Sequence, residues 1–257
     1  MEKLKVCWMS AGISSFIAGY LAKDVDRFIY IDIEDQHEDS IRFIKDCEKI
    51  LGKEIEIISS KQYKNVDQVI RAFGMFKNPY SQYAPCTDVL KKRVRKEWEE
   101  QHKNYEITYV WGFDYNEQHR AEIMNETMIE FNHEYPLIEK MLLKQDAHAM
   151  AHRLGIKRPE MYNIGFKNNN CIGCTKGGMW YWNQIRKYFP EVFEQRAKLE
   201  REIGYAMLKD QTTGKPIFLD ELDPSRGRKE DEINQDCGVM CYLNLDPAII
   251  YKQEDKQ

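Results

Sequence analysis

The stretch Leu4-Lys5-Val6-Cys7-Trp8-Met9-Ser10-Ala11-Gly12-Ile13-Ser14-Ser15 places a turn of small and hydroxyl residues directly after a short apolar run. The run Leu4–Met9 predicts a buried strand, and Phe16–Leu21 predicts the start of a helix. A strand, a tight turn and a helix in this order form the first half of a strand–helix–strand unit. We therefore expect the chain to begin with a parallel α/β sheet.

The same alternation continues along the first half of the chain. Further strands are predicted at Phe28–Ile31, Ile55–Ile58 and Ile107–Trp111. Helices are predicted between them at His37–Leu51, Val66–Phe76 and Val89–Gln101. This pattern predicts an α/β fold, a Rossmann-like parallel sheet with right-handed crossovers.

The composition changes near residue 133, where helical and cysteine-rich segments replace the strands. We expect helices from Tyr135-Pro136-Leu137, at Leu142–Leu154, around Trp180–Phe189 and from Pro190 to about Met207, then a long loop over residues 211–241. The predicted organisation is a nucleotide-binding core over 1–132, a helical cysteine-rich region over 133–245 packed on the core, and a polar tail over 246–257.

Composition limits the classes of protein. The chain has 257 residues, 42% of them hydrophobic, and a net charge of −4, which suits a globular protein and disfavours bulk electrostatic binding of nucleic acid. No apolar run approaches the roughly 18 residues of a membrane span. Seven cysteines, an odd number, do not resemble a secreted disulfide framework, and we expect a cytoplasmic protein.

The turn after the first strand has the chemistry of an anion site. The small residues Ala11 and Gly12 let backbone N–H groups approach a phosphate, and the helix N-terminus adds partial positive charge. The hydroxyls of Ser10, Ser14 and Ser15 can donate hydrogen bonds as well. An ordinary turn that caps a helix is the alternative. The turn has neither the Gly-Lys-Ser/Thr of a Walker loop nor the Gly-x-Gly-x-x-Gly of a dinucleotide fold.

Ser-x-Gly-x-x-Ser in this position resembles the pyrophosphate loop of the adenine nucleotide alpha hydrolase superfamily, the PP-loop ATP pyrophosphatases. The usual form is Ser-Gly-Gly-x-Asp-Ser, and Ala11 and Ser14 replace its first Gly and its Asp. Ser-Ser at this place resembles members of the phosphoadenosine phosphosulfate (PAPS) reductase-like family. The resemblance implies a loop that holds the phosphates or the sulfate of an adenine nucleotide, which is PAPS, adenosine phosphosulfate (APS) or ATP.

Other segments resemble the same family in the same order. Ile31-Asp32-Ile33 matches its strand-ending Asp, and Gly112–Arg120 matches its Gly-x-x-x-x-Glu-x-x-Arg segment. The basic stretch Arg226-Gly227-Arg228-Lys229 matches its arginines. The resemblance thus implies a nucleotide site that contains Ser10, Gly12, Ser14, Ser15, Asp32, Gly112, Arg120, Arg226 and Arg228. Independently, ligands of doubly wound sheets bind beyond the carboxyl ends of strands, where Ser10, Asp32 and Gly112 fall. A turn role for Asp32 and a surface ion pair for Arg120 are the alternatives.

The cysteines predict a metal. Cys171-x-x-Cys174 suits two thiolates on one ion or cluster, and Cys86 falls at a predicted helix N-terminus, where a thiolate is stabilised. This layout resembles sulfonucleotide reductases that carry a 4Fe–4S cluster, except that Pro85-Cys86 replaces their Cys-Cys pair. The resemblance implies Cys86, Cys171, Cys174 and Cys241 as metal ligands. Structural Zn²⁺ and the absence of a metal are the alternatives.

Asp236-Cys237-Gly238 resembles the segment of those reductases whose cysteine attacks the sulfate sulfur, which implies Cys237 as the catalytic nucleophile. The roles of Cys237 and Cys241 could also be exchanged. The other two cysteines that we considered, Cys7 and Cys47, are predicted to be small buried hydrophobes. The aromatic run Trp180–Trp182 is predicted to be helix core, and the basic residues of Lys91–Lys96 a solvated helix face.

Three functions follow. The first is a PAPS reductase-like oxidoreductase of sulfur metabolism, served by a thioredoxin-like thiol donor. The second is an ATP pyrophosphatase that transfers sulfur to tRNA or DNA, partners that we do not favour. The third is a non-catalytic nucleotide-binding protein with a structural metal. No membrane partner is expected, and a homo-oligomer is compatible with the sequence.

Overall fold

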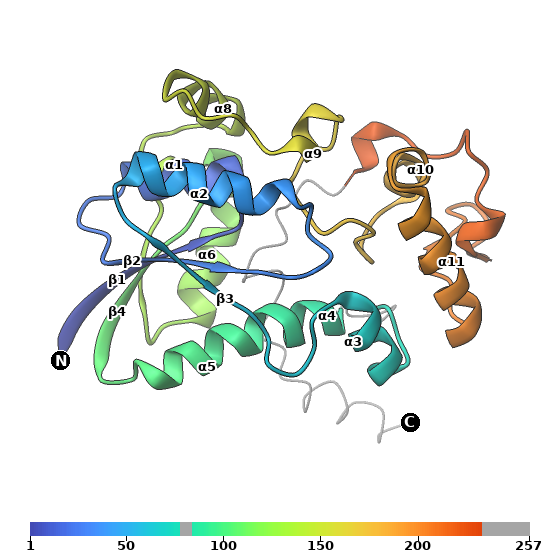
Figure 1. Ribbon diagram of the computed structural model, residues 1–257, viewed down its shortest axis with the longest axis horizontal. Coiled ribbons are helices and arrows are strands. Elements are labelled where there is room, and N and C mark those ends of the chain that lie inside the picture. The colour runs from blue at the N-terminus through green and yellow to red at the C-terminus, as the bar shows by residue number, and fades with distance from the viewer. Residues whose placement is uncertain (78–83, 233–257) are drawn as a thin grey trace.

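A five-stranded parallel sheet forms the centre of the protein, as seen in a computed structural model that describes residues 1–77 and 84–232 (Figure 1). Its strands lie in the order β3-β2-β1-β4-β5. They are β1 (Glu2–Met9), β2 (Arg27–Ile31), β3 (Ile55–Ile58), β4 (Tyr105–Val110) and β5 (Asn132–Glu134). The Rossmann-like α/β class is confirmed, and the four strands expected from the sequence are present.

The helices of the first half are α1 (Ile13–Leu21), α2 (Asp39–Leu51), α3 (Val66–Phe73), α4 (Pro85–Thr87), α5 (Arg93–Gln101) and α6 (Gln118–Thr127). A π-helical turn, η1 (Asp88–Lys92), joins α4 to α5, and a 3-10 turn, η2 (Tyr115–Glu117), precedes α6. The predicted helix at Val66–Phe76 ends earlier, because Gly74 takes the left-handed conformation with φ of 65°.

The second half is mainly helical. It contains α7 (Pro136–Glu139), α8 (Lys144–Arg153), α9 (Glu160–Asn163), α10 (Met179–Tyr188) and α11 (Pro190–Ile203). A hairpin of β6 (Leu208–Lys209) and β7 (Pro216–Ile217) follows, with the 3-10 turns η3 (Leu219–Glu221) and η4 (Lys229–Asp231). The helix from Pro190 ends at Ile203 rather than near Met207, because Gly204 takes a φ of 72°.

Both faces of the sheet are covered, so alternate residues of each strand enter two separate hydrophobic clusters. Cys7 and Met9 of β1 pack with α1, α2 and α8. Val6 and Trp8 pack on the opposite face with α3, α5 and parts of the cysteine region. Figure 1 shows α1 and α2 on one side of the sheet and α5 on the other. Cys47 is fully buried beside Cys7, which confirms both as core residues.

The helical pair α10 and α11 lies beyond the carboxyl ends of the strands (Figure 1). Tyr181 and Trp182 of α10 are buried, which confirms the aromatic run as helix core. The loop that carries Cys171 and Cys174 leads into α10 and therefore lies on this edge of the sheet. Within the described ranges, the structure has no helix long and apolar enough to cross a membrane.

Two features of the first half differ from expectation. Neither α6 nor β5 was predicted, and β5 has the polar sequence Asn132-His133-Glu134, which lacks a strand pattern. Its conformation comes from pairing with Thr108–Val110 of β4.

The expectation that Lys91–Lys96 forms a solvated face is wrong for two of its members. Lys91 and Arg95 are buried, and Arg95 forms an ion pair with Glu99 at 3.5 Å.

Candidate functional site

The segment Ser10–Ser15, which we call the anion loop, joins β1 to α1. Gly12 is the N-cap of α1 and supplies no side-chain cap, and the first turn of the helix contains no acidic residue. The N–H groups of a helix's first turn have no partner inside the helix. They and the helix dipole therefore favour an anion at this end of α1.

Hydrogen bonds inside the loop fix its shape. The Ser15 hydroxyl accepts from the Ser10 N–H at 3.0 Å, donates to the Gly12 carbonyl at 3.0 Å and lies 3.1 Å from the Ser10 hydroxyl. Ala11 adopts a left-handed φ of 55°. Ser15 thus maintains the loop, while Ser10 remains partly exposed at its edge.

Gly112, just after β4, lies directly under the loop. A β-carbon on Gly112 would be 2.6 Å from both the N and the Cα of Ser15 and 2.9 Å from the carbonyl carbon of Ser14. Because the contacts are with backbone atoms, no side-chain rotation could relieve them. The structure therefore brings Ser10, Gly12, Ser14, Ser15 and Gly112 together.

Asp32 follows β2 on the same edge of the sheet. Its N–H donates to the Ile58 carbonyl at 2.8 Å, and one of its carboxylate oxygens lies 3.5 Å from the Tyr30 hydroxyl, which also donates to Gln36. Burial, together with Asp32 and Cys171, raises the pKa of Tyr30.

The cysteine segment is hydrogen-bonded to the anion loop. The Asn169 amide donates to the Ala11 carbonyl at 2.8 Å and to the Ser40 hydroxyl at 3.0 Å. The remaining amide oxygen of Asn169 is buried without a hydrogen-bond partner. Two residues after Asn170, the Ile172 N–H donates to the Asp35 carbonyl at 2.7 Å. The anion loop and the cysteine segment thus form one continuous site.

A buried ion pair holds this arrangement from the side of α11. The Arg196 guanidinium, 3% exposed, contacts the Asp35 carboxylate at 2.7 Å, the Gly173 carbonyl at 3.4 Å and the Asp67 carboxylate. Burial raises the pKa of Asp35, and the charge of Arg196 opposes that shift. Arg196 therefore ties the loop after β2 to the turn between Cys171 and Cys174.

Three of the predicted metal ligands lie in this region. Cys171 and Cys174 are buried, Cys86 is half-buried, and none of them is in a disulfide. The Cys86 sulfur is 3.8 Å from the Thr175 hydroxyl. The Tyr181 hydroxyl braces the turn, because it accepts from the Cys174 N–H at 2.9 Å and donates to the Cys171 carbonyl at 2.8 Å.

Thiols are donors that suit zinc and iron–sulfur clusters, and Cys86 contacts Thr175, the residue that follows Cys174. In the described part of the chain, however, no group of three or more His, Cys, Asp or Glu side chains is arranged to hold a metal ion. The predicted nucleophile Cys237 and the predicted ligand Cys241 both lie outside the described residues.

The three predicted arginines form ion pairs within the protein. Arg120 pairs with Glu117 and stacks on the Phe113 ring at 4.2 Å. Arg226 pairs with Asp210 at 2.8 Å, and Arg228 pairs with Asp231 at 2.9 Å. The structure gives no contact between these arginines and the anion loop.

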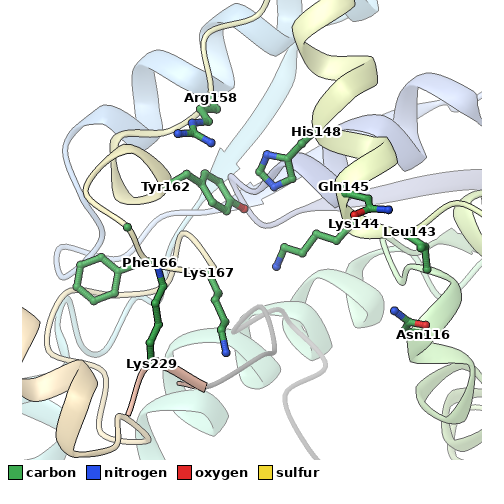
Figure 2. A pocket seen from close by; sticks show the side chains of 11 residues that line it. Asn116, Leu143, Lys144, Gln145, His148, Arg158, Tyr162, Phe166, Lys167 and Lys229 are labelled. Atoms are coloured by element: carbon green, nitrogen blue, oxygen red, sulfur yellow. The ribbon is translucent and has the colours of Figure 1, made fainter. Parts of the chain in front are cut away.

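Sequence reasoning missed a basic cavity of about 610 Å³, which we call the lysine pocket. Its lining includes Lys144, His148, Arg158, Tyr162, Lys167 and Lys229 (Figure 2). The Tyr162 hydroxyl accepts from the N–H of Ile13 at 3.4 Å, so the pocket shares a wall with the first turn of α1. These residues are scattered over positions 144–229 and have no common motif.

No protein-family model matches this chain. The chain is similar to an uncharacterized protein, MJ0066, of Methanocaldococcus jannaschii, with 25% identity over 189 residues. The match covers 71% of this chain and 37% of that protein, so the chain spans little more than a third of the relative's length. The fold and the site define a Rossmann-like α/β protein with a helical, cysteine-containing C-terminal part.

Proposed function

We propose that this chain binds an adenine nucleotide with the phosphates or sulfate against the anion loop, and that it is a PAPS reductase-like enzyme. One observation carries the proposal. The hydrogen bond from Asn169 to the Ala11 carbonyl links the Cys171–Cys174 segment to the anion loop. Sulfonucleotide chemistry needs this combination, in which thiols face the anionic end of a nucleotide.

The reaction that the sequence resemblance implies uses Cys237. Its thiolate attacks the sulfate sulfur, the bond between that sulfur and the bridging phosphate oxygen breaks, and the nucleotide leaves with the electron pair. The product on the protein is a cysteine S-sulfonate. A dithiol donor of the thioredoxin type then releases sulfite and is itself oxidised to a disulfide. Positive partial charge at the anion loop stabilises the departing phosphate.

The cysteines of the site would hold the metal. Cys86, Cys171 and Cys174 would supply three thiolates, and Cys241 would supply the fourth. Such a set suits a 4Fe–4S cluster, which would supply redox-active iron beside the nucleotide, and Zn²⁺ is the alternative occupant.

The binding test is isothermal titration of the anaerobically purified protein with PAPS, APS and ATP. We expect binding of at least one of them, and weaker binding by Gly112→Ala. Sulfite release that is lost in Cys237→Ser would support the reductase. AMP and pyrophosphate as products would instead indicate an ATP pyrophosphatase. Binding without any turnover would indicate a nucleotide-binding protein, and no binding of any nucleotide would refute the proposal.

The metal test measures iron, zinc and acid-labile sulfide per chain, with an absorbance spectrum. About four iron and four sulfide, lost in Cys171→Ala, are expected for a 4Fe–4S cluster. Cys47→Ala is a matched control, because Cys47 of α2 is buried in the hydrophobic cluster on the other face of the sheet. About one zinc without sulfide would refute the iron–sulfur assignment and leave a structural metal.

A further inference from the structure

Positive charge gathers in the lysine pocket from four separate elements. Lys144 begins α8, Arg158 precedes α9, Lys167 precedes the cysteine segment and Lys229 begins η4. Over residues 1–77 and 84–232, none of these four cations forms an ion pair with a carboxylate. Their charges therefore remain largely uncompensated by the described protein.

Two of the ammonium groups of the pocket donate to neutral oxygen atoms. The Lys144 ammonium donates to the side-chain carbonyl of Asn168, and the Lys167 ammonium donates to the Glu230 carbonyl at 3.2 Å. Both acceptors are neutral. Figure 2 shows the ends of Lys144 and Tyr162 directed toward the same space, with Lys167 on its other side. An anion that entered this space would meet charged donors that form no ion pair within the described residues.

Two carboxyl groups act on these cations, those of Asp231, which interacts with Lys167, and of Glu232. Glu232 is 6% exposed, accepts from the Lys167 N–H at 3.0 Å, and has a second carboxyl oxygen without a partner. Burial raises the pKa of Glu232, against the effect of Lys167, Lys229 and Lys144. Two carboxyls cannot balance four cations, so the described lining of the pocket is net positive and favours anions.

The pocket and the anion loop are neighbours through two contacts. Tyr162 lines the pocket and receives the Ile13 N–H of α1. Asn168 contacts Lys144, and the next residue, Asn169, contacts the Ala11 carbonyl. One small molecule can therefore reach both places. A cavity of about 610 Å³ is also larger than a single phosphate group needs and lies in the usual range for small-ligand sites.

We propose that one nucleotide occupies both places. Its first anionic group lies at the anion loop, and the lysine pocket binds a second anionic group of the same molecule. The ligand is then an adenine nucleotide with phosphates beyond the α position. Two sources share this chemistry, a phosphate on the ribose and a polyphosphate chain. The inference rests on the proposed nucleotide binding and adds to it the charge class of the ligand.

The test compares the affinities of AMP, adenosine 3′,5′-bisphosphate and ATP for the whole protein. We expect one of the two more highly charged nucleotides to bind at least about tenfold more tightly than AMP, because several charge-assisted contacts are added. The double variant Lys144→Gln/Lys167→Gln should lose this advantage, and its AMP affinity should stay within about threefold of wild type. Preference for the bisphosphate would identify a ribose phosphate, and preference for ATP a polyphosphate.

The matched control is Lys140→Gln/Lys198→Gln, which removes two exposed lysines outside the pocket. Lys144→Arg/Lys167→Arg keeps the charge and should retain most of the advantage. Circular dichroism and thermal unfolding confirm that each variant is folded. If Lys144→Gln/Lys167→Gln still bound the more highly charged nucleotide more tightly than AMP, the role of the lysine pocket would be refuted. The same would follow if the wild type bound neither of them more tightly than AMP. In both cases the proposed function would remain. Failure of all three nucleotides to bind would overturn the proposed function together with the role of the pocket.

Discussion

Gly112 and Ser15 touch through their backbones, since a β-carbon on Gly112 would lie 2.6 Å from the Ser15 nitrogen. The end of β4 thereby supports the anion loop that follows β1, its neighbour in the sheet. Any side chain at position 112 would displace the loop rather than simply add volume.

Gly112→Ala should therefore weaken both nucleotide binding and the fold. We expect a loss of affinity of about tenfold or more, and a decrease in unfolding free energy of about 1–3 kcal/mol from overpacking. Titration calorimetry and chemical denaturation measure the two effects. Unchanged affinity in a folded variant would contradict the role of Gly112 as the floor of the loop.

Ala11→Gly should be well tolerated, because Ala11 already has the left-handed φ of 55° that glycine adopts without strain. Relief of about 1 kcal/mol of strain is offset by the lost burial of a methyl group, so the net change in stability should stay within about 1 kcal/mol. Ala11→Val should destabilise the protein strongly, since a β-branched residue disfavours this conformation. Equal stabilities of the glycine and valine variants would show that the loop is not constrained at this position.

Arg196→Met should leave two carboxylates, those of Asp35 and Asp67, without their buried cation. The expected cost is about 3–5 kcal/mol of unfolding free energy. Adding Asp35→Asn to this variant should restore part of the lost unfolding free energy, because it removes one of the two carboxylates that have lost their cation. The measurement is a double-mutant cycle by urea denaturation. Strict additivity of the two changes would exclude coupling between Asp35 and Arg196.

Glu200 predicts a specific pH dependence of stability. Its carboxylate is buried, accepts from the N–H groups of Met207 and Leu219 at 2.6 Å each, and has its pKa raised to about 7 by burial. Between about pH 4.5 and 7 the folded protein holds a proton that the unfolded chain has released. Stability should therefore fall as pH rises through this window, by about 3 kcal/mol, and level off above it.

Glu200→Gln does not titrate, so it should flatten this part of the stability profile. It should change stability at pH 5 by less than about 1 kcal/mol, because the wild-type carboxyl is protonated there and, like the amide, presents one carbonyl oxygen to the two N–H groups. Glu194→Gln, an exposed change on the same helix, is the control and should keep the wild-type slope. A slope that is unaltered in Glu200→Gln would assign the pH dependence to other groups.

The sequence was sufficient to predict the elements that local pattern determines. The apolar runs of β1 to β4 and the small residues of the anion loop are local signals, and their order predicts the sheet. Local pattern could not predict β5, whose polar residues become a strand by pairing with β4. It also failed for Arg95, because the composition of the helix gives no sign that Glu99 and Met128 enclose it.

The candidate site also has parts that the local sequence predicts and parts that only the folded structure shows. The anion loop, Gly112 and the Cys171–Cys174 pair follow from short motifs, and the structure brings them together. The lysine pocket depends on side chains from α8, the segment before the cysteines and η4, which only the folded chain assembles. The contact of Asn169 with Ala11 was equally invisible, because nothing local to either residue indicates it.

The contacts that close the site have consequences for the order of folding. Asn169 and Ala11 are 158 residues apart in the chain, and Arg196 and Asp35 are 161 apart. Contacts of such long sequence separation form late, since the entropy of closing a long loop is lost before they form. We expect the sheet to be assembled before the cysteine segment docks. A newly synthesised chain would then acquire its strands first, while Cys171 and Cys174 are still exposed to solvent.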